Sequence, residues 1–184
     1  MIDTRYRMKK YFRIICFVVF FHLIPFHPAG IPQAQSPGAE KHIVGWIEYA
    51  TLFPQNLKIK AKLDTGARNS SLNAVNIVEF KRGEETLVRF DLTNWKGRTE
   101  TIETKVIRMA KIKQHNSAPQ RRPVIRIGIC LGKVYKEVEV NLQDRSNFNY
   151  QLLVGRSFLK GDLVVDAAKT FTLKADCRKV VLDE

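Results

Sequence analysis

The sequence has few of the side chains on which metal-dependent and serine hydrolases rely. Beyond residue 36 it has only two histidines, His42 and His115, which lie far apart in the chain. A zinc protease needs three protein ligands and usually carries a His-Glu-x-x-His motif, which is missing here. A serine triad would lack a suitable histidine base. The composition therefore argues against both mechanisms, and we expect no metal ligands and no cofactor.

Two further absences limit the partners. No glycine-rich loop ends in Gly-Lys-Ser or Gly-Lys-Thr, so ATP binding is not indicated. No nucleic-acid-binding module is recognisable, although the net charge is +13. Without residues 1–36 the chain keeps 26 Lys or Arg and 17 Asp or Glu, a net charge of +9. This charge favours acidic peptides, a membrane surface or cell-wall polymers as partners, rather than nucleic acid. An ordinary basic surface is the alternative.

Cysteine is scarce as well. Cys16 lies in an apolar N-terminal segment, so Cys130 and Cys177 are the two that a folded domain would keep. In an oxidising compartment two cysteines permit one disulfide but do not require it. Cys130 lies in an apolar strand pattern, and we expect it to be a buried free thiol. No pair has the Cys-x-x-Cys spacing of a metal or redox motif.

The chain begins with a basic segment followed by an apolar one. Five Lys or Arg side chains fall within residues 5–13, and residues 14–26 are apolar except for His22 and Pro25. Thirteen residues is the length of a signal-peptide core and is short for spanning a bilayer. A segment rich in Pro, Ala, Gln and Ser follows, without a lipoprotein cysteine. The pattern predicts a signal peptide.

The cleavage site is indistinct, because Pro32 and Pro37 disfavour the two candidate positions. An uncleaved anchor, with a membrane tether through residues 11–28, is therefore the alternative. We predict that residues 1–36 are a signal peptide or N-terminal anchor with linker, and that residues 41–184 form the folded domain. In either case the domain would be exported, to the periplasm or to the periplasmic face of the inner membrane.

Short strand patterns dominate the remainder of the chain. Residues 57–63 alternate strictly, with apolar side chains on one face and lysines on the other. Turn signals recur about every eight to twelve residues, which is typical of an all-β barrel or sandwich. One helical turn is expected near residues 157–161. The other predicted strands are residues 42–52, 72–80, 86–92, 98–108, 124–130, 133–142, 163–166 and 170–175.

The most informative stretch is Lys-Leu-Asp-Thr-Gly-Ala, residues 62–67. Asp64 follows the alternating strand, so its carboxylate would lie at a tight turn and point into a loop. Gly66 permits a close backbone approach that a Cβ would block, and Thr65 can hydrogen-bond across the turn. The Asp-Thr-Gly triplet alone is a weak signal. A second segment, Gln-Leu-Leu-Val-Gly-Arg-Ser-Phe-Leu at residues 151–159, strengthens it.

Together, the triplet and the apolar-apolar-Gly segment resemble the two elements that form the catalytic loop region of aspartic proteases. Residues 124–140 and 152–156 look like the C-terminal half of a retroviral protease, a retropepsin. The chain is similar, over roughly residues 43–175, to a bacterial family of retropepsin-like proteins often labelled ATP-dependent zinc proteases. Asn69 departs from the family, where threonine is more usual. The shared segments are Val44-Gly45-Trp46, residues 60–68, Ser71-Leu72, residues 153–159 and residues 164–166.

This resemblance implies a closed, retropepsin-like barrel that works as a two-fold dimer. It implies that Asp64, Thr65 and Gly66 are catalytic, with Thr65 supporting the paired loops across the two-fold axis. Residues 109–121 occupy the flap position, that of the hairpin that closes over bound peptide, although they lack a glycine-rich tip. An ordinary surface loop is the alternative. The substrate-binding residues would be Ala67, Arg68, Arg156 and the flap residues Met109, Ile112 and His115.

The chemistry of an aspartic protease requires two carboxylates about 3 Å apart that share one proton. The chain has one Asp-Thr-Gly triplet and no second copy. The missing carboxylate must then come from a second chain, with Asp64 facing its mate on a two-fold axis. We therefore predict a homodimeric, aspartic-type endopeptidase. The alternative is a catalytically weak peptide-binding dimer of the same fold, associated with ATP-grasp peptide ligases.

Two arginines beside the predicted cleft need partners. Viral enzymes have an acidic residue where this chain has Arg68, and that acid pairs with the arginine that corresponds to Arg156. Two unpaired guanidiniums near one cleft would be costly. We expect Glu48 to pair with one of them. Otherwise the substrate would bring the carboxylate, which would suit a protease for acidic peptides such as glutamate-rich tails.

Overall fold

The computed structural model describes residues 40–114, 117–174 and 176. These described residues all fall within one unit of the chain. The predicted signal peptide or anchor, the flap residue His115 and the cysteines Cys16 and Cys177 lie outside the described residues. Within those described ranges, no helix is both long enough and apolar enough to cross a membrane.

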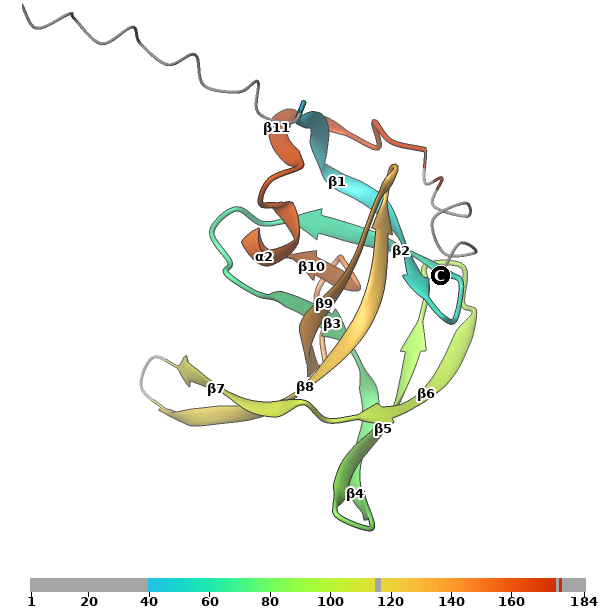
Figure 1. Cartoon of the computed structure of the whole chain (residues 1–184), viewed down its shortest axis with the longest axis vertical. Helices are drawn as coiled ribbons and strands as arrows, with labels where there is room; N and C mark the ends of the chain where they lie inside the picture. Colours follow the sequence, from blue (N-terminus) through green and yellow to red (C-terminus); the bar gives the residue numbers. More distant parts are fainter. Residues whose placement is uncertain (1–39, 115–116, 175, 177–184) are drawn as a thin grey trace, which may run out of the picture. The chain divides into compact units, whose positions relative to one another are not determined.

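The described part of the chain consists of strands β1 to β11 and one short helix, α2 (Figure 1). The helical turn predicted near residues 157–161 is α2, which begins one residue earlier and ends two residues earlier. The elements are β1 (His42–Phe53), β2 (Leu57–Leu63), β3 (Ser70–Asn73), β4 (Val75–Arg82), β5 (Glu85–Thr93), β6 (Thr99–Lys105), β7 (Arg108–Gln114), β8 (Ser117–Leu131), β9 (Val134–Gln143), β10 (Leu152–Val154), α2 (Arg156–Leu159) and β11 (Leu163–Thr170).

Six strands close into a barrel in the order β1-β2-β10-β3-β9-β8, because β1 pairs with both β2 and β8. β11 adds to the barrel in parallel beside β1, and β7 extends the sheet beyond β8. β4, β5 and β6 form a separate antiparallel sheet. The predicted fold class, an all-β closed barrel with one short helix, is confirmed.

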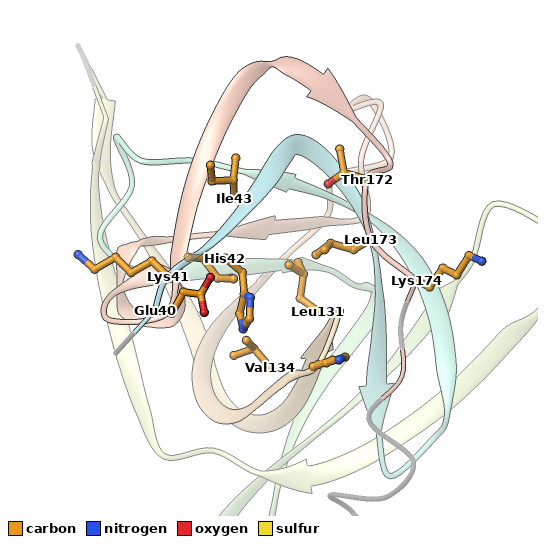
Figure 2. A pocket seen from close by; sticks show the side chains of 12 residues that line it. Glu40, Lys41, His42, Ile43, Leu131, Val134, Thr172, Leu173 and Lys174 are labelled. Carbon is orange, nitrogen blue, oxygen red and sulfur yellow. The ribbon is translucent and has the colours of Figure 1, made fainter. Parts of the chain in front are cut away.

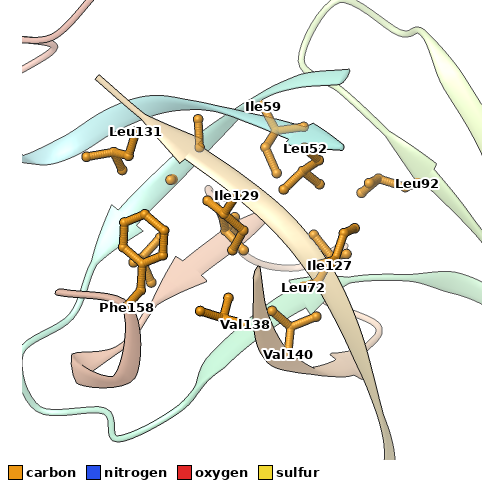
Figure 3. Packing of buried hydrophobic residues seen from close by; sticks show 14 of the residues in the cluster. Leu52, Ile59, Leu72, Leu92, Ile127, Ile129, Leu131, Val138, Val140 and Phe158 are labelled. Carbon is orange, nitrogen blue, oxygen red and sulfur yellow. The ribbon is translucent and has the colours of Figure 1, made fainter. Parts of the chain in front are cut away.

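Strand β2 explains where the barrel core lies. Leu57, Ile59 and Ala61 are fully buried and Leu63 nearly so, while the lysines between them reach solvent. Figure 3 shows Ile59 among apolar side chains from other strands of the barrel. Burying one such aliphatic side chain contributes about 1.5–3 kcal/mol. The alternation read from the sequence therefore holds β2 in register and places Asp64 directly after its buried end.

Two predicted strands are each divided in the structure. The segment 72–80 was expected to be one strand, but the strand is interrupted at the buried residue Ala74. Ser70–Asn73 pairs within the barrel, and Val75–Arg82 pairs with β5 in the second sheet. The segment 98–108 divides in the same way into β6 and the start of β7. The halves differ in their tertiary partners, which a local alternating pattern does not reveal.

β7 and β8 form a long antiparallel hairpin, paired from Arg108 with Val124 to Gln114 with Ser117. Residues 109–121, for which a flap and an ordinary surface loop were the alternatives, lie in this hairpin. Figure 1 shows that it extends away from the barrel. The segment therefore has the regular geometry of a flap, and its closure over a peptide stays a prediction.

The strand predicted over residues 170–175 is wrong. β11 ends at Thr170, and Phe171 has a φ of 53°, a left-handed conformation that interrupts a strand. The backbone N–H groups of Thr172 and Leu173 then donate to the carboxylate of Glu48 rather than to a neighbouring strand. A side chain from β1 takes the place that a strand partner would have.

Cys130 is disulfide-bonded, so the prediction of a free thiol is wrong. Its side chain lies in β8 and is 1% exposed, which agrees with the apolar pattern around it. Such a pattern predicts burial only, because disulfide formation depends on where a second cysteine lies in space. Both other cysteines of the chain fall outside the described residues.

Candidate active site

Asp64 begins a tight loop at the end of β2. Its backbone N–H donates to the carbonyl oxygen of Val154 in β10, at 2.8 Å. Its carboxylate oxygen Oδ1 accepts the backbone N–H groups of Gly66, at 2.9 Å, and Ala67, at 3.1 Å. The other oxygen, Oδ2, has no hydrogen-bond partner among the described residues. The half-buried carboxylate is thus held by one oxygen and free at the other.

Gly155 lets a second segment lie directly behind this loop. A Cβ at Gly155 would come within 2.6 Å of the carbonyl oxygen of Asn69, closer than packed atoms approach. Its N–H donates to Ser70 Oγ at 3.2 Å, and the next N–H, of Arg156, donates to the carbonyl oxygen of Ala67 at 2.9 Å. The glycine of the apolar-apolar-Gly segment therefore fixes the position of the Asp64 loop.

The Arg156 side chain holds the loop from the other side. Its Nη1 donates to the carbonyl oxygens of Thr65 and Gly66, both at 2.8 Å. These two carbonyls would otherwise need water, because neither takes part in a strand ladder. Arg156 was expected to bind substrate, and the contacts that the structure gives it are to the Asp-Thr-Gly triplet itself.

Glu48 links the start of β1 to the chain after β11 and does not contact the Asp64 loop through its hydrogen bonds. Its side chain is fully buried. Oε1 accepts the backbone N–H of Gly45 at 2.9 Å, and the N–H and Oγ1 of Thr172 at 2.8 and 2.6 Å. Oε2 accepts the N–H of Leu173 at 3.1 Å. The carboxylate is satisfied by the start of β1 and by the chain after β11.

The expected ion pair between Glu48 and Arg68 or Arg156 is therefore wrong. The carboxylate points toward the returning chain, and its donors are backbone and hydroxyl groups. Arg156 is occupied by the two loop carbonyls. Arg68 is exposed and forms no ion pair with any acid in the described part of the chain. An internal carboxylate for Arg68 is thus not found where the sequence suggested it.

A cavity of about 230 Å³ lies between the segment after Asp64 and the hairpin of β7 and β8, called the flap hairpin below. Two of the predicted substrate-binding residues, Arg68 and Ile112, lie on its wall. Met109 instead lines a pocket of about 530 Å³, as expected if neighbouring side chains of β7 point to opposite faces. The lining of the 230 Å³ cavity is Arg68, Asn69, Arg108, Ala110, Ile112, Val124, Glu139 and Asn141.

The profile of the RimB-like family, described as retropepsin-like aspartic endopeptidase RimB, matches residues 43–176. The chain belongs to this family. The match contains both the Asp64 loop and the Gly155 segment that backs it, so the two segments described above are part of the retropepsin-like fold of this family. The resemblance read from the sequence is confirmed at the level of family and fold.

Curated relatives of this RimB-like chain are named "Probable alpha-L-glutamate ligase". The protein from Shewanella pealeana is 39% identical over 118 residues, which are 62% of this chain and 26% of the relative. The protein from Parasynechococcus marenigrum is 34% identical over 130 residues, 68% of this chain and 28% of the relative. The chain therefore spans about a quarter of the length of the curated relatives that it matches.

A solved structure also resembles the RimB-like chain. It is the crystal structure of Lpg0085, a protein of unknown function from Legionella pneumophila. The TM-score is 0.63 at 38% sequence identity, over 73% of this chain and 100% of the Legionella chain. The likeness supports the barrel fold and supplies no activity.

The structure also brings to the site of this RimB-like chain residues that sequence reasoning missed. Asn141 is buried in β9, where its Nδ2 donates to the carbonyl oxygen of Ser70 at 2.9 Å. Its Oδ1 accepts Ser71 Oγ at 3.1 Å and Arg122 Nη1 at 3.2 Å. Asn141 thus links β3 to the flap hairpin. Its signal in the sequence is weak, because Asn141 lies between Val140 and Leu142 in a strand that also carries lysine and glutamate, and Arg122 carries no local signal.

A larger pocket of about 540 Å³ lies elsewhere in the RimB-like domain (Figure 2). Its wall includes the apolar side chains of Leu131, Val134 and Leu173, while Lys41 and Lys174 point outward at its edge. No residue of the Asp64 loop or of α2 contributes to it. In the described ranges there is no group of three or more His, Cys, Asp or Glu side chains that could hold a metal ion.

Proposed function

We propose that this protein is an aspartic-type endopeptidase in which Asp64 works with Asp64 of a second copy of the chain. The observation that carries the proposal is the Asp64 carboxylate, which is held by two backbone N–H groups at Oδ1 and has no hydrogen-bond partner at Oδ2 among the described residues. A carboxylate fixed in this way leaves one oxygen for a shared proton or a water molecule. The tight backing by Gly155 and Arg156 supports the proposal, because a dyad needs a rigid loop.

In the proposed mechanism the two Asp64 carboxylates share one proton, since two negative charges so close are not both stable. The ionised carboxylate removes a proton from water, and the protonated one donates to the scissile carbonyl oxygen. Water attacks the carbonyl carbon, and no covalent intermediate with the protein forms. Proton transfer to the leaving nitrogen then releases the two peptide products.

The dimer is part of the proposal, because one chain supplies a single Asp-Thr-Gly triplet. Mixing wild-type protein with Asp64→Asn protein under conditions of subunit exchange tests it. Each mixed dimer would have only one ionisable dyad member, so peptide hydrolysis per wild-type chain should fall to about half when the two proteins are equal in amount. Hydrolysis is measured with a fluorogenic peptide library.

Glu84→Gln protein is the matched control for the mixing experiment. Glu84 is exposed at the β4–β5 turn, and its substitution changes one acid to an amide away from Asp64. Adding this variant should raise hydrolysis in proportion to its amount. Unchanged activity per wild-type chain on adding exchange-competent Asp64→Asn would reject the shared dyad.

A second candidate function is a catalytically weak, peptide-binding dimer associated with ATP-grasp peptide ligases. The observation that favours it is the set of relatives named as glutamate ligases, each about four times the length of the matched segment. Binding of a peptide by both wild-type and Asp64→Asn protein, with no hydrolysis by either across pH 3 to 8, would support this function over proteolysis.

We also propose that the domain is exported. The support is the basic segment and apolar run of residues 5–26. A fusion of residues 1–40 to a reporter that is active only in the periplasm should be active outside the cytoplasm. Replacing two leading basic side chains, Lys9 and Lys10, with glutamate is the control and should lower export. A cytoplasmic, unprocessed reporter from the unaltered fusion would contradict the proposal.

A further inference from the structure

We propose that the face around the 540 Å³ pocket binds the surface of an anionic phospholipid membrane. This face is made of residues 40–43, 131–134, 163–164 and 172–174, and it is called the lysine-rimmed face below. The inference goes beyond the proposed peptidase, because no residue of the Asp64 loop lines the pocket. It rests on the proposed export only for the membrane that the domain would meet.

The wall of the pocket is apolar and is held in place by the fold. Leu131 is fully buried and Leu163 nearly so, and Leu173 packs against the barrel core. Gly132 has a φ of 63°, and a Cβ at this position would lie 3.1 Å from Leu173 Cδ1. The carbonyl oxygen of Gly132 accepts the backbone N–H of Asp176 at 2.8 Å. The chain after β11 is thus fixed against the β8–β9 turn, and the apolar wall is preformed.

Exposed apolar side chains continue this wall outside the pocket. Ile43 lines the pocket and is 64% exposed. Val164, its cross-strand neighbour in the edge strand β11, is 47% exposed. Large apolar side chains gain free energy when they leave water, and exposed apolar surface with a polar rim is typical of interaction sites. This part of the domain therefore favours an apolar partner.

The rim of the same pocket is basic. Lys41, Lys133 and Lys174 are exposed and line the pocket, and Glu40 is the one acid beside them. In the part of the chain that the structure describes, none of the three lysines forms an ion pair. Figure 2 shows Lys41 and Lys174 on opposite sides of the pocket, both pointing outward. Lysine stems can lie along apolar surface while their ammonium groups reach an anion.

An anionic membrane surface matches both properties of the lysine-rimmed face. Its phosphate groups attract the lysines, and its acyl region accepts the apolar side chains between them. Nucleic acid would neutralise the lysines and would leave Ile43 and Val164 in water. A neutral apolar ligand would fill the pocket and would leave the lysines without anions. A phospholipid with a negative headgroup is therefore the partner whose chemistry fits the whole face.

The place where the chain enters the domain agrees with this partner. Glu40, the first described residue, lines the pocket. Eleven residues, 29–39, separate it from the proposed tether of residues 11–28. An extended chain of this length spans at most about 40 Å. A retained tether would therefore keep the lysine-rimmed face within that distance of a bilayer.

The test uses full-length protein reconstituted into vesicles of phosphatidylglycerol and phosphatidylcholine. A small fraction of the phosphatidylglycerol carries a diazirine in its acyl chain, which cross-links to protein on illumination, and mass spectrometry of the peptides locates the labelled residues. We expect labelling within residues 40–43, 131–134 and 172–174. Labelling within residues 1–39 is the internal reference, because the apolar segment there should contact lipid in every variant.

The triple variant Lys41→Gln, Lys133→Gln, Lys174→Gln tests the rim. Labelling of the lysine-rimmed face, relative to residues 1–39, should fall by at least about tenfold, since each lysine near an anionic surface strengthens binding about fivefold. Ile43→Gln, with the lysines intact, should lower it by about threefold or more, because it removes an exposed apolar contact. The thermal unfolding temperature of each variant confirms that the domain is folded.

The matched control is the triple variant Lys81→Gln, Lys96→Gln, Lys111→Gln. It removes three exposed lysines that lie outside the lysine-rimmed face, so the net charge changes equally. Labelling of that face should stay within about twofold of the wild type. Equal losses in the two triple variants would overturn the inference, because they would indicate general attraction of a basic protein to the vesicle.

Three other results would also overturn the inference. Labelling confined to residues 1–39 would show that the domain itself does not contact lipid. Equal labelling in vesicles of phosphatidylcholine alone, with the diazirine on that lipid, would remove the role of negative charge. Dissociation of a dimer by the Lys41, Lys133 and Lys174 substitutions, seen by sedimentation velocity in solution, would make this face an interface between copies of the chain.

The same proteins keep this inference separate from the proposals above. Peptide hydrolysis in solution should be unchanged in the Lys41, Lys133, Lys174 variant, since these side chains lie outside the Asp64 loop. Labelling of the face in a protein that cleaves no peptide would support the membrane surface and reject the peptidase. Cleavage without such labelling would reject the membrane surface and keep the peptidase.

Discussion

Asp64→Asn protein is expected to fold and bind peptides as the wild type does, and to lose hydrolysis by at least roughly 10³-fold. Asparagine keeps an oxygen that can accept the N–H groups of Gly66 and Ala67, so the loop should be preserved. It cannot hold or release the proton that the proposed dyad shares. The measurement is the rate of cleavage of a peptide library between pH 3 and 8, beside the thermal unfolding temperature.

Asp162→Asn is the matched control for this prediction. Asp162 is ion-paired to Lys136 at 2.5 Å near the start of β11 and takes no part in the Asp64 loop. Its amide variant should keep hydrolysis within about twofold of the wild type. Cleavage by Asp64→Asn protein at the wild-type rate would contradict the aspartic mechanism. Loss of wild-type activity on adding a metal chelator would point to a metal-dependent reaction instead.

Glu48→Gln is expected to cause the largest loss of stability, lowering the free energy of unfolding by about 3 kcal/mol. The buried carboxylate accepts three N–H groups and one hydroxyl. A glutamine side chain has one acceptor oxygen, so its amide N–H₂ group would face backbone donors in a buried place. Chemical denaturation measures the change, and the unfolding temperature should fall by roughly 6–12 °C.

Glu40→Gln controls for the loss of one negative charge, because Glu40 is exposed just before β1. The free energy of unfolding of this variant should lie within about 0.5 kcal/mol of the wild-type value. A Glu48→Gln protein as stable as the wild type would show that the four hydrogen bonds contribute little. The loss of stability in Glu48→Gln protein should be the same with and without peptide, because Glu48 does not line the 230 Å³ cavity and its hydrogen bonds do not involve the Asp64 loop.

The position of Glu48 also changes how the arginines beside the cleft are understood. An acid in the Gly-Trp-x-Glu element was expected to neutralise Arg68 or Arg156. The structure uses that acid to bind the chain after β11, and it uses Arg156 to bind loop carbonyls. Arg68 then lines the 230 Å³ cavity beside the β7–β8 hairpin and forms no ion pair with an acid in the part of the chain that the structure describes. This arrangement is the reason to test acidic peptides first.

The sequence alone determined the features that depend on neighbours along the chain. The strict alternation of residues 57–63 specified a half-buried strand, and it placed Asp64 at the end of that strand. The Asp-Thr-Gly triplet and the Gly155 segment specified the family, because their close backbone contact tolerates few other residues. These features were predictable since strand burial has a period of two residues and a tight approach requires glycine.

Only the tertiary structure decided the features that depend on residues distant in the sequence. The strand is interrupted at Ala74 because β3 pairs within the barrel and β4 pairs within the second sheet. The disulfide of Cys130 depends on a second cysteine whose position in space the local sequence pattern does not reveal. Glu48 meets Thr172 across 124 positions, and the N–H of Arg145 donates to the Asn73 side chain across 72. Charged side chains have no periodic signature that names their partner, because hydrogen bonds and charge interactions act through space and not along the chain.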